Sequence, residues 1–180
     1  MGGAALALQL GHGTSVDFDL FIQKEIPSGL LGKVKEVFSK ATVKPLVNNK
    51  GELTVLVNEV KCTFFNSVFV PVLPLIRYEQ VPMASVREIA ADKAHTIGRR
   101  GKYRDYIDLY FILKEKHVPL DEIIQLAEKK YGDEFNGRLF LEQLLYLEDI
   151  EDDPISFLKK PVTKLDIRVL FEQEIKNIKL

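Results

Sequence analysis

The chain has 180 residues, of which 46% are hydrophobic and 28% are charged. This balance is typical of a water-soluble globular protein, either one domain or a core with an appended lobe. The formal net charge of −1 excludes the strong overall basic excess that many nucleic-acid-binding proteins show. Cys62 is the only cysteine, which excludes an internal disulfide and a multi-cysteine metal site.

The composition also predicts a location in the cytoplasm. No apolar run approaches the roughly 20 residues that a membrane-spanning helix needs. The first residues, MGGAALALQLGHG, lack the basic segment of a signal peptide, and Gln9 interrupts their apolar part. A lone cysteine favours a reducing compartment. We therefore expect a cytoplasmic protein that has no membrane partner.

The N-terminal half predicts a small sheet with two helices. Its elements are marked by apolar periodicity, by glycine and proline breaks, and by stretches rich in β-branched and aromatic residues. The expected elements are a helix over 4–10, a strand over 17–22, a helix after the break at 27–29, a turn at 48–51 and two strands over 53–60 and 61–70.

The C-terminal half predicts helices almost to its end. Ser85 and Glu88 have the spacing of a capping box ahead of an apolar-periodic segment. The segment 120–131 has acids in its first turn, lysines in its last turn and Gly132 as a stop. Further helices are expected near 136–148 and 163–178, and the acidic stretch 148–153 is expected to be a solvated linker. The fold class is therefore α+β, with a sheet domain over 1–82 and a helical region over 83–180.

Two carboxylates stand one residue apart in the predicted strand over 17–22, within the segment GHGTSVDFDLF. Strand side chains alternate, so Asp17 and Asp19 share one face. Phe18 and Leu20 should then point to the other face, into the core. Neighbouring carboxylates repel each other unless a cation joins them, and Mg²⁺ binds one or two carboxylates together with substrate phosphates. The pair indicates either a Mg²⁺ site or a solvated strand face.

Glycines open the predicted helix that leads to this strand. Gly2 and Gly3 precede the apolar run 4–10. The N–H groups at a helix N-terminus suit phosphate, and glycine lets a ligand approach closely. Thr14 and Ser15 add hydroxyl groups. The alternative is that glycines next to the initiator methionine bind nothing.

A second group of charged residues lies in the segment AADKAHTIGRRGKYRDYIDL, over 90–109. Lys93 falls on the apolar stripe of its helix, so its ammonium either reaches solvent or meets an anion. Asp105 and Asp108 share one face of an otherwise apolar helix, where charges are rare unless they are paired. They either line the same cleft as the paired carboxylates of the strand or form a structural network with the arginines of this segment: Arg99, Arg100 and Arg104.

Those arginines belong to the one dense basic cluster of the chain, which consists of Arg99, Arg100, Lys102 and Arg104. The cluster fits a triphosphate or an RNA backbone, and it equally fits a solvated loop. The three histidines show no metal-ligand spacing, and His12 is expected to cap the end of the first helix.

Two segments resemble a known family. GGAALALQLGHGTSVDFDLF resembles the first motif of the AbiEii/AbiGii toxin-type nucleotidyltransferases, and DKAHTIGRRGKYRDYIDLYFIL resembles their later Lys…Arg…Asp-x-x-Asp motif. The two motifs stand in the family's order, and the resemblance covers roughly residues 1–115.

The resemblance implies a DNA-polymerase-β-like nucleotidyltransferase fold, a small mixed sheet flanked by helices and followed by a helical lobe. It implies Mg²⁺-dependent transfer of a nucleoside monophosphate from an NTP to an acceptor hydroxyl, with tRNA or another RNA as the acceptor and an antitoxin as a partner. The helices over 83–115 would complete the site. The implied metal ligands are Asp17 and Asp19, the implied nucleotide contacts are Gly2, Gly3, Ser15 and Lys93, and the residues that complete catalysis are Lys93, Asp105 and Asp108. Arg99 and Arg100 of the basic cluster are expected to bind the nucleotide as well.

Three departures from the family pattern keep two other readings open. Gly13 stands where relatives often have a basic residue, and relatives usually carry a segment before the Gly-Gly pair. The strand around Thr63 lacks the third carboxylate of polymerase-like sites, the nearest acid being Glu59. The first alternative is a non-catalytic member that binds a nucleotide or a partner. The second is an enzyme that modifies a small molecule such as an antibiotic, which the near-neutral charge favours.

Overall fold

The computed structural model describes residues 2–151 and 153–178, without the side chain of Arg100. Two compact units emerge from the contacts, and each is described here by itself. One unit consists of Met1–Ala4 and Ser15–Val70, and the other consists of Ala5–Thr14 and Pro71–Leu180. The domain boundary expected at residue 82 remains a prediction.

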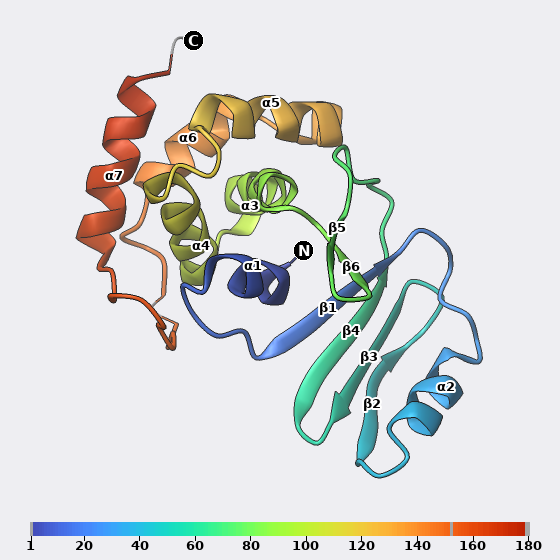
Figure 1. The fold of residues 1–180 in the computed structure, drawn as a ribbon. Helices are drawn as coiled ribbons and strands as arrows, with labels where there is room; N and C mark the ends of the chain where they lie inside the picture. Colours follow the sequence, from blue (N-terminus) through green and yellow to red (C-terminus); the bar gives the residue numbers. More distant parts are fainter. Residues whose placement is uncertain (1, 152, 179–180) are drawn as a thin grey trace. The chain divides into compact units, whose positions relative to one another are not determined.

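The first unit is built on a mixed four-stranded sheet in the order β1-β4-β3-β2 (Figure 1). β1 runs parallel to β4, and the other neighbours are antiparallel. The strand predicted over 17–22 is β1, and the two later predicted strands are β3 and β4, whereas β2 was not predicted. The strands are β1 (Asp17–Ile22), β2 (Val43–Asn48), β3 (Glu52–Val57) and β4 (Val60–Asn66).

One face of this sheet forms a core with α2 (Leu30–Val37), which follows the predicted break at 27–29. Alternate residues of β3 are buried there together with Val34 of the helix: Leu53, Val55 and Val57. The prediction that Phe18 and Leu20 enter the core is wrong, because they are 47% and 40% exposed. They lie on β1 at one edge of the sheet, whereas α2 packs against β2 at the other edge.

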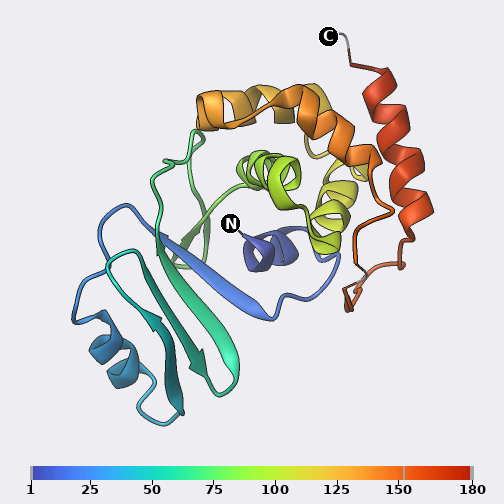
Figure 2. The same cartoon turned by 180° about the vertical axis from the view of Figure 1, so that it is seen from behind.

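The described part of the second unit consists mainly of helices and also contains a short hairpin of β5 (Ile76–Tyr78) and β6 (Val81–Met83), which was not predicted. α3 is central and packs against α4, α5 and α6, while α7 packs against α4 and α6 (Figures 1 and 2). The predicted helices are all present as α1 (Gly3–Leu10), α3 (Val86–Arg100), α4 (Tyr103–Lys114), α5 (Leu120–Tyr131), α6 (Gly137–Leu145) and α7 (Lys164–Lys176), with a 3₁₀ turn, η1 (Gly132–Glu134), after α5.

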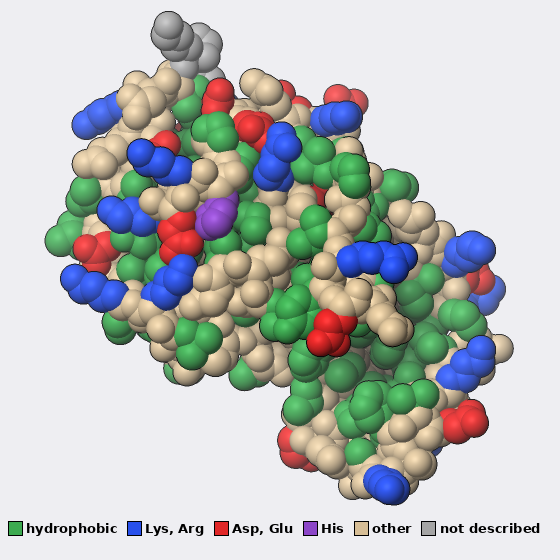
Figure 3. All heavy atoms as spheres, viewed as in Figure 1, with side chains coloured by type: hydrophobic (Ala, Val, Ile, Leu, Met, Phe, Trp, Pro, Cys, Tyr) green, Lys and Arg blue, Asp and Glu red, His purple; other side chains and the backbone are tan. Residues whose placement is uncertain are grey.

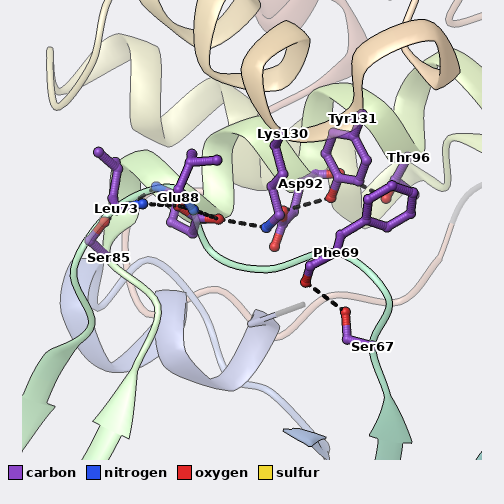
Figure 4. A network of polar contacts seen from close by, with 10 residues as sticks. Ser67, Phe69, Leu73, Ser85, Glu88, Asp92, Thr96, Lys130 and Tyr131 are labelled. Carbon is purple, nitrogen blue, oxygen red and sulfur yellow. Dashed lines mark hydrogen bonds and ion pairs between the residues drawn. The ribbon is translucent and has the colours of Figure 1, made fainter. Parts of the chain in front are cut away.

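The start of α3 differs from the expected capping box. The Ser85 side chain does accept a hydrogen bond from the Glu88 N–H, at 3.3 Å. The Glu88 carboxylate, however, does not turn back to Ser85. It accepts hydrogen bonds from the backbone N–H groups of Val72, at 3.1 Å, and Leu73, at 3.0 Å (Figure 4). A buried carboxylate thus ties the segment before the hairpin to α3.

A buried polar network also joins α3 to α5 (Figure 4). The Lys130 ammonium lies 2.6 Å from Glu88 and forms a second ion pair with Asp92. The Tyr131 hydroxyl donates to Asp92 at 2.7 Å. Burial, as the larger cause, and the Asp92 charge, as the smaller one, raise the pKa of the Tyr131 phenol. Because each buried carboxylate has a cation or several donors, the network is satisfied rather than a charge left in the core.

No helix in the described part of the chain is both long enough and apolar enough to cross a membrane.

The turn between α3 and α4 depends on a glycine for space. A Cβ atom built on Gly101 would lie 2.6 Å from Cε2 of Tyr106, whose side chain is fully buried. We expect Gly101→Ala to lower the free energy of unfolding by about 1–3 kcal/mol, the usual effect of overpacking. Gly29→Ala is the matched control, because a Cβ there meets nothing within 4 Å. Equal urea midpoints for the two variants would contradict this prediction.

Candidate active site

A buried ion-pair cluster joins α3 and α4. The Lys93 ammonium lies 2.7 Å from Oδ1 of Asp105 and 2.5 Å from Oδ2 of Asp108. Asp105 and Asp108 face α3 together because they are three residues apart on α4. Lys93 is 7% exposed and Asp108 is 4% exposed. The sequence left open whether the lysine reaches solvent or meets an anion. In the structure it meets two anions.

Lys93 and Asp108 keep each other ionised. Burial by itself would lower the pKa of Lys93, but Asp108 and Asp105 outweigh it and raise that pKa above its usual range. Burial would raise the pKa of Asp108, but Lys93 and His12 lower it overall. Lone buried charges would neutralise, so the pairing keeps both groups charged.

These shifts predict how stability depends on pH. The folded-state pKa of Asp108 lies below its ordinary value of 3.8, so its contribution is complete above that value and is lost as the pH falls through the folded pKa. Because its pKa is raised, Lys93 stays charged at neutral pH and causes no loss of stability there. As the pH falls below 3.8, we expect the urea midpoint to decrease more steeply in the wild type than in Asp108→Asn. Parallel slopes would contradict the assignment.

His12 completes the cluster, a role that the sequence analysis missed. Its Nε2 lies 2.8 Å from Oδ1 of Asp108, and both side chains are buried. The prediction that His12 caps the first helix is wrong. The N–H of Gly11 makes the last bond of α1, to the carbonyl of Ala7 at 2.8 Å, and the imidazole turns to α4 instead. The partners are 96 residues apart, so no local pattern could have shown the contact.

The predicted metal ligands lie in the other unit. Asp17 and Asp19 occupy alternate positions of β1 and so share a face, as expected. Asp17 is partly exposed and Asp19 is exposed. Their register partners on β4 are Lys61 and Thr63, which are not acids. Two strand carboxylates on one face suit a Mg²⁺ ion that takes its other ligands from water and phosphate.

In the part of the chain that the structure describes, no third acid joins this pair in a metal-binding group. Glu59, the nearest candidate in sequence, lies in the turn between β3 and β4 with a φ of 67°. Within residues 2–151 and 153–178, no group of three or more His, Cys, Asp or Glu side chains is placed to hold a metal ion by itself. A bound cation would therefore depend on substrate oxygens for much of its coordination.

The predicted phosphate contacts of this unit are adjacent in space. α1 begins at Gly3, directly after Gly2. A Cβ built on Gly3 would lie 3.6 Å from Oγ of Ser15. Ser15 in turn donates its hydroxyl to the carbonyl of Asp17 at 3.1 Å. The hydroxyl thus lies next to the helix start and is bonded to the backbone of Asp17, the first residue of β1.

Two of the four residues of the basic cluster are paired with acids. Arg99 lies 2.7 Å from Glu134, and Arg104 lies 4.0 Å from Asp153. The side chain of Arg100 lies outside the described part of the structure. On the face shown in Figure 3, lysines and arginines are scattered among acidic side chains and do not gather in one patch.

A cavity of about 410 Å³ opens beside this cluster, at the start of α4. Its lining combines Lys102 and Tyr103 with several acids of the stretch after α6: Asp149, Glu151 and Asp153. Acidic walls repel a triphosphate, so this cavity does not suit the nucleotide.

The comparisons with known proteins bear on both the family and the fold. A family model described as nucleotidyl transferase AbiEii toxin, type IV toxin–antitoxin system, matches residues 52–180, more than half of the chain. The chain belongs to the AbiEii nucleotidyltransferase family. It is also 28% identical over 158 residues to an uncharacterized protein of Aquifex aeolicus (strain VF5), a match that covers 84% of this chain and 74% of that protein.

Two solved structures from Helicobacter pylori confirm the nucleotidyltransferase fold. One is a candidate nucleotidyltransferase with a TM-score of 0.55 and 20% identity, covering 96% of this chain and 84% of the other. The second, JHP933, has a TM-score of 0.55 and 19% identity, with coverage of 96% and 81%. Both the predicted fold class and the prediction of a nucleotidyltransferase enzyme are confirmed.

The family match covers only the later of the two motifs of this AbiEii protein. It includes the ion-pair cluster of Lys93, Asp105 and Asp108 and continues through the helical tail, beyond the extent of the resemblance noted in the sequence. It begins after the carboxylate pair of Asp17 and Asp19. Nucleotidyltransferases generally use a divalent metal ion, and in this chain the assignment of that ion to β1 remains a prediction.

Proposed function

We propose that this AbiEii protein transfers a nucleoside monophosphate from an NTP to an acceptor hydroxyl, with Mg²⁺ held by Asp17 and Asp19. The observation that carries the proposal is the pair of carboxylates on one face of β1, in a chain of a nucleotidyltransferase family. When bound, the ion would neutralise phosphate charge and orient the oxygens of the displacement. Gly2, Gly3 and Ser15 would offer backbone and hydroxyl donors to the triphosphate.

The ion-pair cluster is assigned to the same reaction through the family motif. Lys93 shares its ammonium between two carboxylates, so its first role is to hold Asp105 and Asp108 in place. A phosphate contact would require the ammonium to leave one of them. The side chain of Asp105 is 15% exposed against 5% for Asp108. Asp105 is therefore the better placed of the two to orient an acceptor hydroxyl.

The proposed acceptor is RNA, with tRNA as the first choice, and the proposed location is the cytoplasm. The type IV toxin–antitoxin family of the match supports the choice of acceptor. The single cysteine supports the location. The same family supports an antitoxin as a partner. Arg99 and Arg100 are proposed to approach the nucleotide, which for Arg99 means exchanging Glu134 for phosphate.

The decisive experiment is a transfer assay. The purified protein is incubated with each α-labelled NTP, Mg²⁺ and total tRNA, with EDTA in a parallel reaction. We expect label on tRNA from at least one NTP, and none with EDTA. A well-folded protein that transfers no label to tRNA or to small alcohols would overturn the proposal.

A second candidate function is nucleotide or partner binding without turnover. Lys61 and Thr63 favour it, because they stand on β4 opposite Asp17 and Asp19 where polymerase-like sites usually add an acid. Robust transfer that disappears in Asp17→Ala would exclude this candidate.

Transfer to a small molecule, such as an antibiotic, is favoured by the net charge of −1 and by the scattering of basic residues over the face shown in Figure 3. In that case the label would appear on small alcohols and not on tRNA.

A further inference from the structure

We infer that His12 is a positioning residue, which fixes the Asp108 carboxylate so that the Lys93 ammonium stays between Asp105 and Asp108. This inference rests on the proposed function, because it assigns His12 to the same reaction. His12 would act through Asp108 and would not touch the substrate.

The two carboxylate oxygens of Asp108 contact side chains from two different parts of the chain. Oδ1 lies 2.8 Å from Nε2 of His12, and Oδ2 lies 2.5 Å from the ammonium of Lys93. The side chains of His12, Asp108 and Lys93 are 6%, 5% and 9% exposed. A carboxylate held at each oxygen inside the protein cannot rotate without losing either the hydrogen bond with His12 or the ion pair with Lys93. Lys93 alone would fix one oxygen and leave the other free to swing.

The histidine is itself held on both sides. Gly11 has a φ of 59°, a conformation that glycine adopts at little cost, and it turns the chain after α1. The His12 carbonyl accepts from the N–H groups of Leu158, at 3.1 Å, and Lys159, at 3.4 Å. The His12 ring also contacts Phe111, with centroids 5.2 Å apart. The imidazole is therefore a fixed donor.

The hydrogen-bond pattern selects one tautomer. Nδ1 of His12 is buried and meets no hydrogen-bond partner among the described residues. In the neutral imidazole the proton must then be on Nε2, where the Asp108 carboxylate accepts it. A carboxylate that fixes the tautomer of a histidine is fixed by that histidine in return.

The arrangement assigns different tasks to the members of the cluster. Phe111 and Asp108 stand three residues apart on α4, so one face of this helix presents both the ring and the carboxylate to His12. Asp105, on the next turn of the same face, has its Oδ2 bonded to the N–H of Lys102 at 3.1 Å. Each carboxylate thus has a hydrogen-bond donor of its own, and the Lys93 ammonium is the cation that they share.

The test compares two substitutions of this histidine with one matched control. His12→Leu removes the donor at similar volume, and His12→Gln restores an N–H at similar reach. His117→Leu is the control, because His117 makes the same kind of contact, 3.1 Å to Glu115, at a more exposed position. Loss of orientation by about an ångström typically slows an enzyme about 10²-fold.

We expect kcat for NTP transfer to fall about 10²-fold in His12→Leu, with KM for the NTP unchanged, and to recover mostly in His12→Gln. His117→Leu should match the wild type. A folded His12→Leu with wild-type kcat would overturn the inference, and so would a His12→Gln that is as slow as His12→Leu. If His12→Leu does not fold, the comparison of His12→Gln with Asp108→Asn decides, since the former should remain active and the latter should not.

The imidazole spectrum separates this inference from the proposed function. Nitrogen-15 NMR of the wild type should show His12 as the Nε2–H tautomer, and Asp108→Asn should lose that preference. A protein without any transfer activity would overturn the proposed function, whereas the spectrum would still decide the contact. An Nδ1–H tautomer, or a spectrum unchanged in Asp108→Asn, would overturn the role of His12.

Discussion

Replacing both Asp17 and Asp19 by asparagine should abolish nucleotidyl transfer and leave the protein folded. Asparagine keeps the volume and removes the charge that would hold the metal ion. A bound metal contributes several kcal/mol to transition-state stabilisation, so the loss of activity should be about 10³-fold or more. The free energy of unfolding should hardly change, because Asp17 is only partly buried and Asp19 is exposed on β1. Label transfer and urea midpoints measure the two effects.

A matched control for this variant lies in the same unit. Glu25→Gln removes a carboxylate whose partner, Lys50, is 3.7 Å away at the surface. Exposed pairs of this kind contribute little, so Glu25→Gln should keep full activity and stability. A double Asp17→Asn/Asp19→Asn variant that transfers label at the wild-type rate would show that these carboxylates are not the metal site.

Replacing Lys93 by methionine should cost both stability and activity. The substitution leaves Asp105 and Asp108 facing each other without their cation in a buried site. Breaking a buried ion pair by removing one partner typically costs about 3–5 kcal/mol. We expect a loss of that size in urea denaturation, together with a loss of transfer activity. Arg138→Met is the control, since its partner Glu142 lies at the exposed surface.

A triple variant separates the two effects of Lys93. Combining Lys93→Met with Asp105→Asn and Asp108→Asn removes all three charges at nearly constant volume. Neutral replacement of a buried ionic cluster is often tolerated, so stability should largely return while activity should not. If the triple variant were active, the cluster would be a structural element without a part in the reaction.

The elements that the sequence predicted best are those with strong local signals. α5 has acids in its first turn, lysines in its last and Gly132 after it, and the structure has it over the predicted residues, Leu120–Tyr131. β2 was missed because Pro45 lacks the N–H that a sheet ladder needs. The structure accommodates this proline on an edge strand, with a register shift between Pro45 and Val47.

The site was less predictable because its contacts are long-range. Helical spacing placed Lys93 on an apolar stripe and Asp105 with Asp108 on one face, but it could not show that the lysine joins the two acids. The nearby arginines fit the sequence pattern equally well, yet Arg99 and Arg104 pair with Glu134 and Asp153. A burial argument could have favoured the lysine, since it alone among these cations falls on a stripe that faces the core.

The direction of the Glu88 side chain was also not predictable from local spacing. Its spacing from Ser85 fits a capping box, and half of that box forms. The Glu88 side chain is instead 1% exposed and bonded to Lys130 and to two backbone N–H groups. Local spacing indicated the helix start, whereas packing decided where the carboxylate went.

The most direct test of the account is a titration of the purified protein with each NTP, with and without Mg²⁺, followed by calorimetry and thermal unfolding. An NTP at about 100 times its Kd should stabilise the fold by about 2.7 kcal/mol, which is visible as a rise in Tm. We predict metal-dependent binding of at least one NTP that is lost in Asp17→Ala/Asp19→Ala. Binding that the double variant retains, or no binding by the well-folded wild type, would contradict the account.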